Sequence, residues 1–152
     1  MTKIDTFWKR FLKGTGRDED TPYFEAFHFE LTEKLANELL ELVLAGKKKA
    51  TASSLKSFEL DKSPLPKAGD LSIVTDFHGE PKCVIETTAL TLIPFKDMTY
   101  DICKREGEDD TLESWKQGHR RFYEQEGELL GYTFSEDLII AFEDFKVVYQ
   151  ES

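Results

Sequence analysis

The hydrophobic positions near the N-terminus recur with the period of an α-helix. One stripe contains Ile4, Phe7, Trp8, Phe11 and Leu12. Apolar residues at this spacing lie on one side of a helix, where they can pack against another element. We therefore predict a helix over residues 3–14, ended by Gly14 or Gly16, that packs as a lid on the rest of the chain.

A second helical stripe begins after Thr32, whose hydroxyl can cap a helix. Its apolar members are Leu35, Leu39, Leu42 and Val43. Gly46 can adopt the left-handed conformation that commonly ends a helix. A helix between Thr32 and Gly46 is therefore expected, and three lysines, Lys47 to Lys49, follow directly after it.

Runs of β-branched and aromatic residues predict strands in the middle and at the end of the chain. The expected strands cover residues 50–55, 71–77, 82–95 and 138–149. Phe27 and Phe29 suit a short extended piece, and residues 78–81 form a connection suited to a hairpin. Strands separated by helices without regular βαβ alternation predict an α+β domain on a curved, largely antiparallel sheet. The pattern suits a small closed barrel and an open sheet equally well.

Two further helices are expected late in the chain. The first is short and covers residues 100–105. Asp110 and Glu113 resemble a capping box for the second, which Gly127 should end. This helix carries Leu112, Trp115, His119 and Phe122.

The length of the chain and its net charge indicate a single domain and exclude proteins that bind through a broad basic surface. The 152 residues suit one domain, and 30 acidic against 20 basic residues give a net charge of -10. Such a chain has no broad basic surface for duplex DNA or an anionic membrane. It also lacks a signal peptide and an apolar run of ~20 residues, so we expect a cytoplasmic protein. Cys83 and Cys103 form no CxxC pair and predict buried or free thiols.

The lysine run and one glutamate are the candidate polar site. Lys47, Lys48 and Lys49 can grip an anionic or carbonyl-bearing ligand, or simply offset the dipole of the preceding helix. Lys48 and Thr51 converge only if Lys48 lies in the turn before the strand. Glu86 is the sole charged residue between Lys82 and Lys96, so it either has a buried partner or lies at a strand edge in water.

His119 lies near an acidic run and raises the question of a metal site. The run contains Glu106, Glu108, Asp109 and Asp110. A histidine on an apolar stripe is usually a hydrogen-bonded core residue, and acidic residues before a helix usually cap it. We therefore expect no metal and no cofactor.

Several segments in a fixed order resemble ASCH-domain proteins. They are residues 44–51 (LAGKKKAT), Gly69-Asp70, residues 84–88 (VIETT) and residues 113–122 (ESWKQGHRRF). The resemblance extends from about Phe24 to Tyr149, within a single domain spanning 1–152. It implies a PUA-like, mostly antiparallel β-barrel flanked by helices, and a link to RNA. Small bacterial members hydrolyse the amide of acetylated cytidine through a lysine, a threonine and a glutamate, which match Lys48, Thr51 and Glu86.

The leading hypothesis is therefore hydrolysis of an amide on a modified nucleoside. Thr51 would attack the carbonyl, Lys48 would accept and return its proton, and Glu86 would orient the lysine or protonate the leaving amine. The expected ligand contacts are Lys47, Lys49, Trp115 and His119.

Two other functions remain open at this point. In a non-catalytic RNA-binding module, the lysines would contact phosphates of a short single strand while Trp115, Tyr123 or an exposed phenylalanine stacks a base. A metal-assisted ribonuclease would use the acidic region 106–113.

Overall fold

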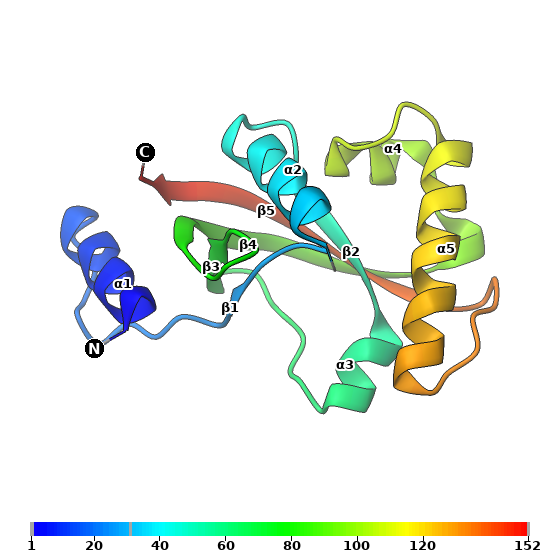
Figure 1. The fold of residues 1–152 in the computed structure, drawn as a ribbon, viewed down its shortest axis with the longest axis horizontal. Coiled ribbons are helices and arrows are strands. Elements are labelled where there is room, and N and C mark those ends of the chain that lie inside the picture. Colours follow the sequence, from blue (N-terminus) through cyan, green and yellow to red (C-terminus); the bar gives the residue numbers. More distant parts are fainter. Residues whose placement is uncertain (1, 31, 152) are drawn as a thin grey trace.

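The computed structural model describes residues 2–30 and 32–151 (Figure 1). In chain order the elements are α1 (Lys3–Gly14), β1 (Ala26–Phe27), α2 (Glu33–Leu44), β2 (Ala50–Ser54), α3 (Leu55–Asp61), β3 (Leu71–Thr75), β4 (Pro81–Pro94), α4 (Tyr100–Cys103), α5 (Leu112–Leu130) and β5 (Ile139–Gln150). Short 3-10 turns flank α4 at Phe95–Asp97 and Lys104–Glu106. The predicted α+β class is confirmed.

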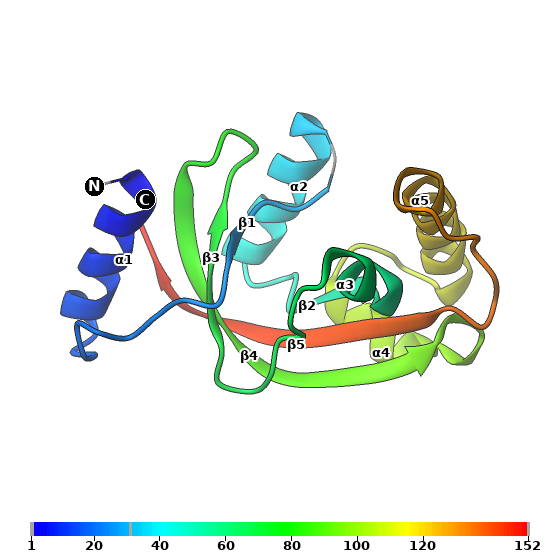
Figure 2. The ribbon, with the colours of Figure 1, turned by 90° about the horizontal axis from the view of Figure 1, so that it is seen from below.

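The sheet is mixed and open. Its strand order is β1-β3-β4-β5-β2, with β1 parallel to β3 and every other pair antiparallel. The long β4–β5 ribbon curves under the rest of the chain (Figure 2). The expected barrel is wrong, because β1 and β2 form the two edges of the sheet and do not pair with each other in the described chain. β1 is only two residues long and pairs with β3 alone, so it offers too little backbone to close the sheet.

Helices α1 and α2 cover opposite faces of β3 and β4 (Figure 2). Ile73 and Val84 pack against the aromatic stripe of α1, whereas Val74 packs in the cluster that includes α2 residues. Adjacent strand residues point to opposite faces, so this alternation requires one apolar helix on each side. The helix predicted over residues 3–14 is thereby anchored on the face away from α2.

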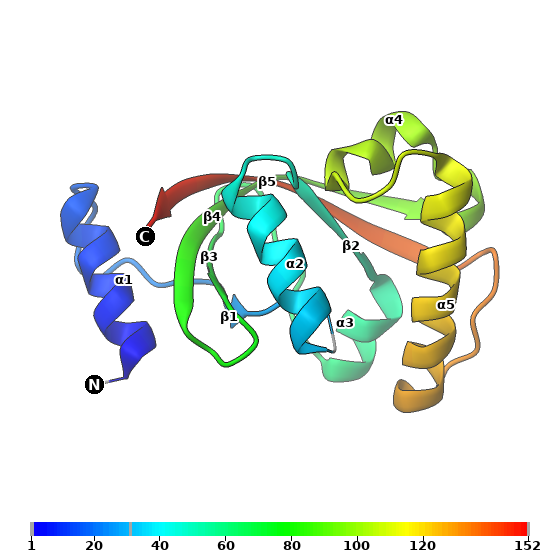
Figure 3. The ribbon, with the colours of Figure 1, turned by 45° about the horizontal axis from the view of Figure 1, so that its top comes forward.

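The far end of the β4–β5 ribbon is covered by α4 and α5 (Figure 3). Phe95, Trp115, Tyr123 and Phe142 are fully buried there. Helix α5 presents Trp115 and Tyr123 to the sheet and leaves its opposite side in solvent. This packing fixes the position of every side chain that α5 contributes to the site.

Local chemistry changes the boundaries of two helices. Thr111 rather than Asp110 caps α5, accepting a hydrogen bond from the backbone of Ser114. The helix continues through Gly127 to Leu130 and is capped by Gly131, whose φ of +94° is left-handed. A Cβ at Gly127 would lie 2.3 Å from the carbonyl oxygen of Tyr132, so this glycine allows a close approach instead of ending the helix.

Helix α3 was not expected from the sequence. Ser54 ends β2 and its hydroxyl accepts the backbone N–H of Ser57, which starts the helix at once. The strand expected to reach Leu55 therefore stops one residue earlier.

Cys83 and Cys103 are buried free thiols, as predicted. Burial raises the pKa of Cys103 to about 11. In the described residues, no helix combines the length and apolar character needed to span a bilayer.

Candidate functional site

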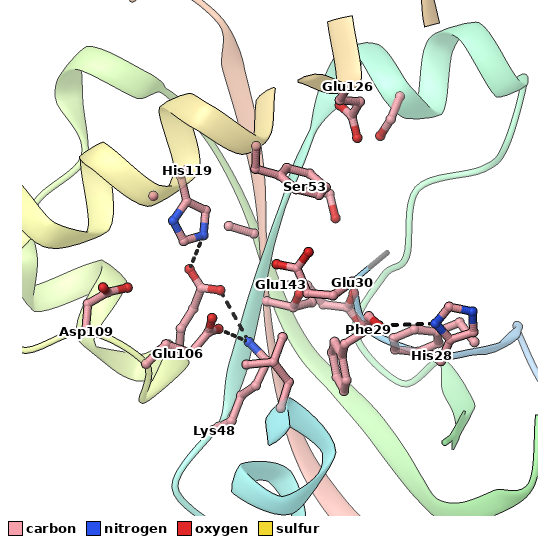
Figure 4. Close-up of a pocket in the computed structure, with 18 of the residues that line it drawn as sticks. His28, Phe29, Glu30, Lys48, Ser53, Glu106, Asp109, His119, Glu126 and Glu143 are labelled. Atoms are coloured by element: carbon pink, nitrogen blue, oxygen red, sulfur yellow. Dashed lines mark hydrogen bonds and ion pairs between the residues drawn. The ribbon is translucent and has the colours of Figure 1, made fainter. Parts of the chain in front are cut away.

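A cavity of about 430 Å³ lies where the two sheet edges face each other (Figure 4). β1 contributes Phe27, and β2 contributes Thr51 to Ser53. Other parts of the wall come from residues 28–30, from Lys48, from the turn that carries Glu106 and Glu108, and from α2, α3, α5 and β5. The place where a barrel would have closed is therefore an open pocket.

Lys48 lies buried at one wall of this cavity. The chain turns after α2 because the backbone N–H groups of Lys47 and Lys48 both donate to the carbonyl of Leu42. The Lys48 ammonium donates to the carbonyl of Ala50 at 2.8 Å, to Glu106 at 3.3 Å and to Glu108 at 2.5 Å. An ammonium has three N–H donors and no acceptor, so all of its hydrogens are engaged.

Glu106 is the buried partner at the centre of the network. One oxygen accepts from Lys48, and the other accepts from the indole N–H of Trp115 at 2.5 Å and faces His119 Nε2 at 3.3 Å. Burial alone would raise the pKa of this carboxyl, but Lys48, His119 and Trp115 together hold it well below its usual range. Glu106 is therefore a fixed anion that holds its neighbours in place.

Glu108 has the opposite electrostatic character. Burial is the main cause that raises its pKa to about 7, and the negative charge of Glu106 adds to the rise while Lys48 opposes it. A carboxyl of this kind exchanges a proton near neutral pH, which is the property of a general acid or base.

Gly107 allows these two glutamates to reach the same lysine. Its φ is +71°, and a Cβ there would lie 2.2 Å from the carbonyl oxygen of Lys47. The backbone N–H of Lys49 also donates to the carbonyl of Arg105 at 2.9 Å. The 105–107 turn is thus packed directly on the lysine segment.

His119 completes the network from α5. Its Nδ1 lies 2.9 Å from the carbonyl oxygen of Trp115, and its ring stacks on that indole with centroids 4.0 Å apart. A carbonyl can only accept, so Nδ1 carries a proton, and Nε2 faces the anionic Glu106. Although burial lowers the pKa of His119, its contacts with Glu106 raise it above the ordinary value.

The opposite wall joins hydroxyls and further carboxyls. Thr51 of β2 is directly opposite Glu143 of β5, so the two side chains share one face of the sheet. Thr87 donates to Glu143 at 2.6 Å. Burial nevertheless raises the pKa of Glu143. The acidic residues that line the cavity are Glu25, Glu30, Glu106, Glu108, Asp109, Glu126 and Glu143.

The structure brings together only part of the set expected from the sequence. Lys48, Thr51 and His119 line the cavity. Glu86 is not among the lining residues. Its neighbour Thr87 faces the cavity side of β4, where its hydroxyl donates to Glu143. Adjacent residues of a strand point to opposite faces, so Glu86 points away from the cavity.

The expected ligand contacts also separate. Lys47 and Lys49 are exposed and are absent from the described lining of the cavity. Trp115 is fully buried, so it supports Glu106 and His119 from behind and presents no face for stacking a base.

Three carboxyls take positions that the sequence did not assign. Glu106 and Glu108 were expected to cap a helix, and nothing local connects them with a lysine 58 or 60 residues away. Glu143 had a weaker signal than Glu86, because it lies in the mostly apolar strand sequence Ala141-Phe142-Glu143-Asp144-Phe145 but has a charged neighbour, Asp144. Across the described ranges, no three or more His, Cys, Asp or Glu side chains are grouped to hold a metal ion.

Comparisons with known proteins agree with this fold. The sequence matches the family model of the ASCH domain over residues 25–149. A crystal structure of an ASCH domain from Lactobacillus crispatus JV V101 is 32% identical, with a TM-score of 0.89 over 97% of this chain and 95% of that one. Protein EF3133 from Enterococcus faecalis V583, assigned to DUF984, is 30% identical, with a TM-score of 0.87 over 96% of this chain and 88% of that one.

A search of curated proteins finds no match. The family match and these two structures support a PUA-like fold of the type linked to RNA. The chain belongs to the ASCH domain family.

Proposed function

We propose that the chain hydrolyses the amide of an acylated pyrimidine nucleoside bound in this cavity. The observation that carries the proposal is the joint placement of a threonine hydroxyl, a buried ammonium and a carboxyl with a pKa of about 7 around one nucleoside-sized space. Nucleophile, charge stabilisation and proton transfer are the three elements that amide hydrolysis requires.

In the proposed acylation step, Thr51 attacks the amide carbon and passes its proton to the carboxylate of Glu143, its cross-strand neighbour. The carbon–nitrogen bond then breaks as protonated Glu108 gives its proton to the leaving amine. Water next attacks the acyl ester, returning a proton to Glu108, while Glu143 returns its proton to the Thr51 oxygen. The enzyme is restored, and the products are an amine and a carboxylic acid.

Lys48 has an electrostatic role in this scheme. Its three engaged N–H groups leave no lone pair to accept a proton, so its charge stabilises the oxyanion that forms on the carbonyl oxygen. In this scheme Glu106 and Glu108, instead of Glu86, orient the Lys48 ammonium, because both form ion pairs with it.

The test is an assay of N4-acylated cytidines with the wild-type protein, Thr51→Ala and Thr51→Ser. The wild type should release the amine, Thr51→Ala should lose at least about a thousandfold in kcat, as for loss of a nucleophile, and Thr51→Ser should retain measurable turnover. Equal rates for wild type and Thr51→Ala would remove Thr51 as the nucleophile. No turnover by the wild type would contradict the proposed reaction.

Membership of an RNA-linked family supports a second candidate, in which the cavity binds one base of a short single strand without chemistry. Exposed Lys47 and Lys49 would then contact phosphates beside the cavity. Binding of a pyrimidine-rich RNA should weaken as salt rises and weaken further in Lys47→Ala/Lys49→Ala. Salt-independent binding, or none at low salt, would exclude this function.

A further inference from the structure

Glu126 is a carboxylate at the end of the cavity away from Lys48 (Figure 4). The hydroxyls of Ser54 and Tyr132 both donate to its Oε1, at 2.5 and 2.7 Å. Ser54 is fully buried, and the close approach of Gly127 to the Tyr132 carbonyl brings Tyr132 to this position. The carboxylate, which α5 carries, is therefore held in one orientation by hydroxyls from β2 and from the segment after α5.

The two donors use only one oxygen of Glu126. Oε2 makes no hydrogen bond to the residues that the structure describes and is available to a ligand. Ser53 lies between Glu126 and Lys48 in the close-up, and its hydroxyl points into the cavity (Figure 4). A fixed acceptor and a hydroxyl that can donate or accept thus lie at the same end.

This pair matches the chemistry of a vicinal diol. One hydroxyl of a diol can donate to the carboxylate while the other exchanges a hydrogen bond with the serine, and carboxylates commonly bind ribose hydroxyls in this way. A phosphate would be repelled, because its charge has the same sign as that of Glu126.

We infer that Glu126 and Ser53 form a subsite for the ribose diol of the nucleoside. The inference rests on the proposed function for the identity of the ligand: with the amide held at Thr51 and Lys48, the end of the cavity that contains Glu126 is left for the sugar. The subsite selects a ribonucleoside over its 2′,3′-dideoxy analogue.

The test measures binding and needs no catalysis. Cytidine and 2′,3′-dideoxycytidine are titrated calorimetrically into the wild type, Glu126→Ala, Glu126→Gln and Glu128→Gln. Glu128 is an exposed neighbour on α5 and serves as the control. The wild type and Glu128→Gln should bind cytidine about 10- to 100-fold more tightly than the dideoxynucleoside, as expected for hydrogen bonds to a charged group. Glu126→Ala should remove this preference and Glu126→Gln should reduce it.

Denaturation by urea shows whether each variant is folded. If Glu126→Ala does not fold, the comparison of the two nucleosides with the wild-type protein still tests the inference. Equal affinity of the wild type for the two nucleosides, or no binding of either, would overturn the inference. The inference would also be overturned if folded Glu126→Gln and Glu126→Ala both kept the full wild-type preference for cytidine over the dideoxynucleoside. A clear cytidine preference without any hydrolysis would support the subsite and contradict the proposed reaction, so the two failures are distinguishable.

Discussion

Replacing Lys48 by methionine tests the electrostatic centre of the site directly. Methionine keeps an unbranched side chain only one atom shorter but removes the ammonium of Lys48, a side chain that is 1% exposed. Glu106, with a side chain 3% exposed, would then be a buried anion that has lost its ion pair with Lys48. Removing one partner of a buried ion pair costs about 3–5 kcal/mol because the remaining charge is uncompensated.

The remaining contacts place the expected loss toward the lower end of that range. Glu106 keeps the donors of Trp115 and His119, and Glu108 can take up a proton because its pKa is already about 7. We therefore expect Lys48→Met to lower the free energy of unfolding by about 3 kcal/mol at pH 8.

The loss should depend on pH in a defined direction. In the wild type the pKa of Glu106 lies below its ordinary value of 4.5, so its stabilising contribution is present above that pH and is lost as the pH falls through the folded value. Burial raises the pKa of Glu106 and Lys48 lowers it, so the pKa of Glu106 rises when Lys48 is replaced. Protonation then relieves the buried charge as the pH falls, so the difference between the two proteins should shrink from pH 8 to pH 5.5.

The assay is urea denaturation followed by the fluorescence of Trp8 and Trp115, both buried. The matched control is Lys47→Met, because Lys47 is exposed and its replacement should change stability by less than about 0.5 kcal/mol. If Lys48→Met costs no more than Lys47→Met, or if its cost does not change with pH, the buried network described for Lys48 is refuted.

Three further predictions concern the neighbouring elements. Gly107→Ala should destabilise the protein by about 2–4 kcal/mol, since it adds a contact with the Lys47 carbonyl to the strain of a positive φ. Gly79→Ala, at a φ of +85° with nothing within 4 Å, should cost only about 1–2 kcal/mol by urea denaturation, and equal costs would contradict the packing explanation. If Glu108 donates its proton to the leaving amine, kcat/KM should fall as the pH rises above about 7, and Glu108→Gln should remove that limb of the profile; an unchanged limb would exclude Glu108. Phe11→Ala should cost about 3–5 kcal/mol in unfolding free energy without changing kcat, because α1 packs on the face of the sheet away from the cavity; a large loss of kcat in the folded variant would contradict this placement.

Elements with a strong local signal were predictable from the sequence. The stripe from Ile4 to Leu12 and the Thr32 cap correspond to α1 and α2 because side-chain periodicity and capping act within a few residues. The prediction that Gly127 ends the last helix was wrong, because the role of this glycine is not local. A glycine after a helical pattern commonly ends it, but here the missing Cβ accommodates the Tyr132 carbonyl, which is a contact between separate parts of the fold.

The open sheet depended on tertiary information. Strand patterns indicate which faces are apolar, and they are the same for a barrel and for a curved sheet. The sheet stays open because the short β1 pairs with β3 and does not reach β2, whose residues line the cavity instead.

By itself the sequence predicted the α+β class and most elements, because periodicity and capping are local properties, and its resemblance to ASCH-domain proteins pointed to Lys48 and Thr51, which line the cavity together with His119. Only the tertiary structure decided which carboxyls accompany them. Glu106 and Glu108 come from a turn 58 and 60 residues beyond Lys48, and Glu143 comes from the strand paired with Thr51, so their proximity follows from chain topology. The pKa of Glu106 and that of Glu108 are set by burial together with the neighbouring charges, and both exist only in the folded chain.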